Sequence, residues 1–126
     1  MSYKNILLID DDTDDTLLFV EAVNAVNKEV VCRTTLNPAK ALEELSTLED
    51  LPDILFLDYN MPVVNGLEFI QRMQNIERLR HIEVIVMSTP PEDVMVAWFG
   101  RNNTSVKYIS KPNSMEELIE ILRELL

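Results

Sequence analysis

Acidic residues crowd together directly after the first strongly apolar segment of the chain, where Ile6–Ile9 is followed by Asp10, Asp11 and Asp12. Neighbouring carboxylates raise one another's pKa values, so a chain that places them beside a buried segment needs a cation to offset their charge. Mg²⁺ prefers hard oxygen ligands and usually binds through one or two carboxylates while it keeps several waters. The triplet therefore predicts a Mg²⁺ site at the end of this segment.

Three other reactive side chains, Asp58, Ser88 and Lys111, each follow closely after another short apolar segment. If these segments are parallel strands, the carboxyl ends of the strands share one edge of a sheet, where open α/β sheets bind ligands. Carboxylates, a hydroxyl and a lysine at one edge suit phosphoryl transfer to a carboxylate nucleophile. The metal and the lysine would neutralise charge on the phosphoryl oxygens, and the hydroxyl would donate a hydrogen bond to one of them.

The short apolar segments alternate with longer amphipathic ones, and the alternation repeats five times. The expected strands are Ile6–Ile9, Val30–Thr34, Ile54–Leu57, Val84–Met87 and Val106–Ile109. The first, third and fourth are continuously apolar, as is typical of strands that are covered on both faces of a parallel sheet. This pattern predicts an α/β domain.

Helices are expected between and after these strands, over residues 14–27, 38–48, 66–76, 91–101 and 115–126. Capping side chains mark three of the starts: Asp12 or Thr13 for the first helix, Asn37 before Pro38 for the second, and Ser114 for the last. In the first helix we expect the residues that face the sheet to be Leu17, Leu18, Val20, Ala22 and Val23.

Bulk properties exclude several classes of protein. A chain of 126 residues with 47% hydrophobic residues is long enough for one globular domain with its own core. A net charge of −11 argues against a nucleic-acid surface. The single cysteine, Cys32, favours a reduced buried thiol, and the sequence contains no signal-peptide core or long apolar span. We therefore expect a cytoplasmic protein with no membrane partner.

The order and spacing of these motifs resemble those of the response-regulator receiver domains of two-component signalling, also called CheY-like. Ser88 lies 30 residues beyond Asp58, and Lys111 lies another 23 beyond Ser88. The matching elements are Leu7–Asp11, Leu57–Gly66, Ser88 and Tyr108–Pro112. The resemblance covers essentially the whole chain and implies a flavodoxin-like, doubly wound (βα)5 fold with parallel strands in the order 2-1-3-4-5 and helices on both faces. Residues 1–126 would form a single receiver domain without an output domain.

The resemblance also implies a role for each acid. Asp58 would be the phosphate acceptor and would contact the metal. Asp11 would be a direct Mg²⁺ ligand, Asp10 would bind the metal or its water, and Asn60 would supply its backbone carbonyl. Asp12 is expected to belong to the helix start instead.

Ser88 and Lys111 would contact the phosphoryl group, and Tyr108 would turn inward when Ser88 is drawn toward the phosphate. This change would remodel the face formed by the fourth helix, the fifth strand and the fifth helix. The implied protein is a switch that assists its own phosphorylation and dephosphorylation, and not an enzyme. Its partners would be a sensor histidine kinase and a target protein or, in a phosphorelay, a histidine phosphotransfer protein. The chain would be a monomer or a phosphorylation-dependent dimer.

Two other interpretations of the acids stay open. The acids from Asp10 to Glu21 imitate the ligand spacing of a calcium-binding EF-hand loop, although Asp15 stands where that loop requires glycine. A phosphohydrolase with an aspartate nucleophile would use Asp10 together with Asp12. Such an enzyme normally has a hydrophobic residue or threonine in the place of Asp14, and a longer chain.

Overall fold

The computed structural model describes residues 5–58, 66–89, 95, 97, 100, 101 and 107–126. Its elements, in chain order, are β1 (Asn5–Ile9), α1 (Thr13–Val26), β2 (Val31–Thr35), α2 (Pro38–Leu45), β3 (Ile54–Leu57), α3 (Gly66–Gln74), the 3₁₀ turn η1 (Glu77–Leu79), β4 (Glu83–Ser88), β5 (Lys107–Ser110) and α5 (Met115–Leu125). All five predicted strands are confirmed, with ends that shift by at most one residue. Of the helix predicted over residues 91–101, the described residues 95, 97, 100 and 101 are helical, and the others lie outside the described part.

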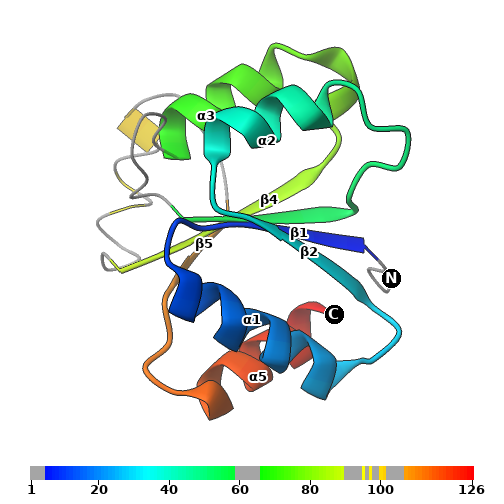
Figure 1. The fold of residues 1–126 in the computed structure, drawn as a ribbon. Coiled ribbons are helices and arrows are strands. Elements are labelled where there is room, and N and C mark those ends of the chain that lie inside the picture. The colour runs from blue at the N-terminus through cyan, green and yellow to red at the C-terminus, as the bar shows by residue number, and fades with distance from the viewer. Residues whose placement is uncertain (1–4, 59–65, 90–94, 96, 98–99, 102–106) are drawn as a thin grey trace.

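The five strands form one parallel sheet in the order β2-β1-β3-β4-β5. Helices α2 and α3 cover one face of the sheet, and α1 and α5 cover the other (Figure 1). The predicted doubly wound arrangement and strand order are therefore confirmed. The chain leaves β1 toward one edge of the sheet to form β2 and returns to form β3 on the other side of β1, so the ends of β1 and β3 lie together at the point where the order reverses.

Strand β3 shows why the polar residues gather at strand ends. All four of its side chains are buried. Alternate residues point to opposite faces of the sheet, and helices cover both faces (Figure 1). Ile54 and Phe56 join the apolar cluster beneath α1 and α5, while Leu55 and Leu57 join the cluster beneath α2 and α3. With both faces filled, the first position where the chain can place a carboxylate is directly after the strand, at Asp58.

Local signals define most helix starts. Asp12, Asn37 and Ser114 each accept a hydrogen bond from the backbone N–H three residues further on, as predicted. The predicted end of α2 is wrong, since the helix ends at Leu45. The guanidinium of Arg78 donates to backbone carbonyls at and beyond this end and satisfies groups that the helix leaves unpaired. Among the described residues, no helix combines the length and apolarity needed to cross a bilayer.

The orientation of α1 corrects one prediction. Ala22 and Val23 are buried as expected, but Leu17 and Leu18 are 60% and 48% exposed. Phe19 is buried instead and packs edge-on against Phe56 of β3, with ring centroids 4.9 Å apart. Because the aromatic pair fixes the rotation of α1 about its axis, the two leucines are turned away from the sheet.

We predict that Phe19→Ala lowers the free energy of unfolding by about 3–5 kcal/mol, because it opens a cavity against β3. Leu17→Ala, in the same helix, should cost less than about 0.5 kcal/mol because its side chain is largely in solvent. Urea denaturation of both variants measures the difference. Equal losses of stability would contradict the orientation of α1.

Candidate functional site

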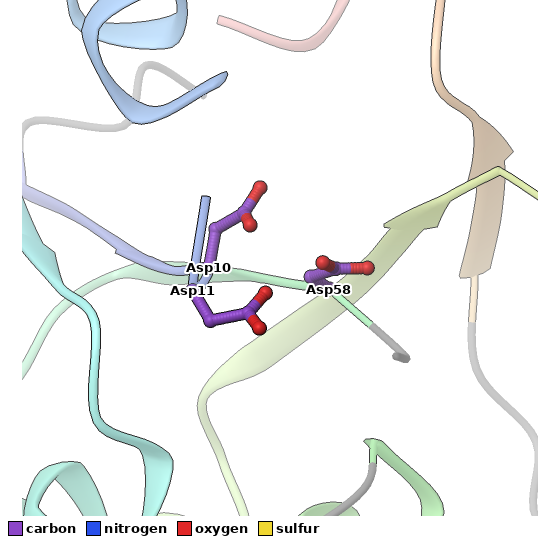
Figure 2. A group of neighbouring side chains, drawn as sticks. All are labelled: Asp10, Asp11 and Asp58. Carbon is purple, nitrogen blue, oxygen red and sulfur yellow. The ribbon is translucent and has the colours of Figure 1, made fainter. Parts of the chain in front are cut away.

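Three carboxylates converge where β1 and β3 end. Asp10, Asp11 and Asp58 each offer an oxygen, and these atoms all lie within 4.8 Å of one another. Figure 2 shows the three side chains gathered at the two strand ends. Asp10 and Asp58 are buried, with 3% and 6% exposure, whereas Asp11 is exposed. The backbone N–H of Asp58 donates to the carbonyl of Ile9 at 2.9 Å, which ties the two strand ends together.

Asp10 is held on both of its oxygens. Its Oδ1 accepts from the backbone N–H of Asp12 at 2.9 Å, and its Oδ2 accepts from Lys111 Nζ at 3.2 Å. Burial nevertheless raises the pKa of Asp10 to about 6, with a further contribution from the charge of Asp58, while the two hydrogen-bond donors oppose the shift. The site therefore favours any cation that stabilises ionised Asp10.

Asp58 is joined to the neighbouring strands through Ser88. The buried Ser88 hydroxyl donates to Asp58 Oδ1 at 2.9 Å. The Ser88 carbonyl in turn accepts from the Tyr108 hydroxyl at 3.1 Å and from the backbone N–H of Lys111 at 2.8 Å. Tyr108 lies inward, with 3% exposure. These bonds connect the end of β3 to the ends of β4 and β5.

Lys111 faces three acids. Its Nζ lies 2.7 Å from Asp15 Oδ2, 3.2 Å from Asp10 Oδ2 and 3.5 Å from Asp58 Oδ2. Burial lowers the pKa of Lys111, but the hydrogen bond to Asp15 and the charges of Asp10 and Asp58 outweigh burial and raise it above its ordinary value. Lys111 therefore remains an ammonium at any physiological pH.

Asp15 is a residue of this site that was not predicted from the sequence. It lies in the first turn of α1. Side chains in a helix lean toward its N-terminus, which here points at the strand ends. That lean was the available signal for placing Asp15 beside the acid cluster.

The structure brings together most of the predicted site residues: Asp10, Asp11, Asp58, Ser88, Lys111 and Tyr108. Asn60 lies outside the described residues. The EF-hand interpretation is wrong, because its proposed loop is the helix α1 from Thr13 onward and the side chain of Asp12 caps that helix. The donor set fits Mg²⁺, since three carboxylates supply the hard oxygen ligands that this ion prefers.

Comparison with known proteins agrees with this geometry. The family model for the response regulator receiver domain matches residues 6–123. The polar-differentiation response regulator DivK of Brucella ovis is 30% identical over 129 residues, which cover 98% of this chain and 96% of DivK. A protein-glutamate methylesterase/protein-glutamine glutaminase of Nitrosomonas europaea is 33% identical over 122 residues, covering 92% of this chain. This chain spans only a third of the length of that enzyme.

Solved structures show the same fold. The phosphorylated cyanobacterial phytochrome response regulator RcpA superposes with a TM-score of 0.83 at 23% identity, covering 98% of this chain and 91% of RcpA. The chemotaxis response regulator CheY4 of Vibrio cholerae gives a TM-score of 0.79 at 18% identity, with 99% and 100% coverage. A Mn²⁺-bound form of the response regulator Rcp1 gives 0.79 at 20% identity, with 97% and 91% coverage. On the family match, the chain belongs to the response regulator receiver domains of two-component signalling.

Proposed function

We propose that this chain is a phosphoacceptor switch that receives a phosphoryl group from a sensor histidine kinase on Asp58. The observation that carries the proposal is the set of groups around this carboxylate. Asp58 receives a hydrogen bond from Ser88 at 2.9 Å, faces Lys111 at 3.5 Å and lies beside the oxygens of Asp10 and Asp11. Phosphoryl transfer to a carboxylate requires such a nucleophile, a hydrogen-bond donor and a cation for the phosphoryl oxygens, and carboxylates that can hold a metal.

In the proposed reaction a carboxylate oxygen of Asp58 attacks phosphorus, and the bond from phosphorus to the kinase imidazole nitrogen breaks. Lys111 pairs with one phosphoryl oxygen, and the Ser88 hydroxyl moves its hydrogen bond from Asp58 to another. Asp10, Asp11 and Asp58 would hold Mg²⁺, which when bound offsets negative charge on the phosphoryl oxygens.

The hydrogen bonds of Ser88 suggest how the phosphoryl group reaches the surface. The Ser88 carbonyl is bonded to both Tyr108 and Lys111, so a shift of Ser88 toward the phosphoryl group acts directly on β5. We propose that the face formed by the fourth helix, β5 and α5 is the output surface for a target protein. Transfer onward to a histidine phosphotransfer protein would use the same Asp58 chemistry in reverse.

We predict that acetyl phosphate with Mg²⁺ adds one phosphoryl group to the wild type, as measured by intact mass. Asp58→Asn should abolish the gain because the nucleophile is lost, and Lys111→Ala should slow the reaction about 10- to 1,000-fold because phosphoryl charge is left unpaired. Asp50→Asn, an exposed site before β3, is the matched control and should react like the wild type.

An undiminished gain in Asp58→Asn would contradict the assignment of the acceptor. Catalytic release of many phosphates per chain, without accumulation on the protein, would favour the phosphohydrolase interpretation instead. We do not propose the methylesterase or glutaminase activity of the Nitrosomonas europaea relative for this chain, because this chain spans only a third of that enzyme.

A second prediction concerns the metal alone. Mg²⁺ should raise the melting temperature, because a ligand of the native state adds stability, about 2.7 kcal/mol at one hundred times its Kd. Asp11→Asn should remove most of this shift and spare the core, since Asp11 is exposed. Asp14→Asn removes the same charge from the nearby α1 and should retain the shift. Thermal unfolding with Mg²⁺ or with EDTA provides the comparison, and equal shifts in the two variants would exclude Asp11 as a ligand.

A further inference from the structure

The ammonium of Lys111 is shared between two kinds of acid. Asp10 and Asp58 belong to the three-carboxylate cluster at the strand ends, whereas Asp15 belongs to α1 and lies outside that cluster. The contact with Asp15 is nevertheless the shortest, at 2.7 Å, compared with 3.2 Å to Asp10 and 3.5 Å to Asp58. An acid outside the cluster therefore holds Lys111 most closely.

These distances rank the three interactions. Charge-assisted N–H···O bonds are strongest at about 2.7–2.9 Å, so the bond to Asp15 has favourable geometry and the contact with Asp58 does not. Asp15 and Lys111 are also only partly open to solvent, with side chains 40% and 23% exposed. Solvent therefore screens the pair less than it screens a fully exposed ion pair. Asp15 on α1 therefore makes the closest contact with the Lys111 ammonium, and Asp58 makes the most distant of the three.

The space around Lys111 permits its ammonium to move. A cavity between α1 and α5 is bordered by Asp10, Asp15 and Lys111 and is otherwise mainly lined by apolar side chains, including Leu18 and Met115. The lysine stem can lie along this apolar wall while the ammonium moves between its acceptors. The position of the ammonium is then decided by the acids that compete for it.

We propose that Asp15 is a positioning residue. It holds the Lys111 ammonium against α1 and so weakens the ion pair between Lys111 and a phosphoryl group carried by Asp58. The inference rests on the proposed function, because it concerns the strength of the phosphoryl site. Loss of the Asp15 charge frees the Lys111 ammonium to form a closer ion pair with the phosphoryl oxygens, which strengthens binding at the phosphoryl site. Asp15 thus sets the affinity of the phosphoryl site without touching the phosphoryl group.

Beryllofluoride, an analogue of the phosphoryl group on a carboxylate, provides the test. Its affinity is measured with Mg²⁺ by ¹⁹F NMR titration. Asp15→Asn, which keeps the size of the side chain, should bind at least about threefold more tightly, as expected when a hydrogen bond between charged groups is redirected. Asp15→Glu should restore affinity close to that of the wild type. Asp14→Asn removes the same charge from the same turn and should change the affinity less than Asp15→Asn does.

A double-mutant cycle identifies the route of the effect. With Lys111→Met as background, Asp15→Asn should leave beryllofluoride affinity unchanged, because no ammonium remains to be positioned. Direct repulsion between Asp15 and the ligand would instead persist in that background and would overturn the proposal. The ¹³Cε resonance of Lys111, recorded without beryllofluoride, should shift in Asp15→Asn and not in Asp14→Asn.

The outcomes separate this inference from the function on which it rests. If the wild type binds no beryllofluoride with Mg²⁺, the proposed function fails and the inference fails with it. If the wild type binds and Asp15→Asn binds equally or more weakly, only the role of Asp15 is overturned. An unchanged Lys111 resonance in Asp15→Asn would overturn the ion pair itself.

Discussion

The ion pairs of Lys111 with Asp10 and Asp58 are the interactions on which the site at the strand ends depends. Two buried carboxylates, Asp10 and Asp58, lie near one another, and burial of unpaired charge costs several kcal/mol in general. Lys111 contacts both of them. It is separated from Asp10 by 101 positions in the chain, so this balance of charge exists only when the sheet is complete.

The order of strands in the sheet brings Lys111 close to Asp10 and Asp58. Strands β1 and β3 are filled with apolar side chains on both faces, and the order of the sheet places their carboxyl ends side by side. The end of β5 is brought close by the bond from the Lys111 backbone to the Ser88 carbonyl. A lysine supplied from one side of the sheet thus faces acids supplied from its centre, and the acids remain open to a metal at Asp11.

Much of this arrangement could be predicted from the sequence. Continuous apolar segments identified the central strands, and the rule that parallel strand ends share an edge brought Asp58, Ser88 and Lys111 together. The strand order came from family resemblance, because periodicity does not specify which strands pair. The rotation of α1 was predicted wrongly for Leu17 and Leu18, since it depends on the contact of Phe19 with Phe56, 37 positions away. The end of α2 and the role of Asp15 likewise depend on distant partners, Arg78 and Lys111.

In the proposed function Asp58, and not an acid of the triplet, forms the covalent bond to phosphorus. Borohydride reduction converts an aspartyl phosphate to homoserine, and peptide mass spectrometry then locates the modified position. After treatment with acetyl phosphate and Mg²⁺, we expect homoserine at position 58 and intact aspartate at positions 10 and 11. Homoserine at position 10 or 11, or a protein that gains phosphate but yields no homoserine, would contradict the proposed function.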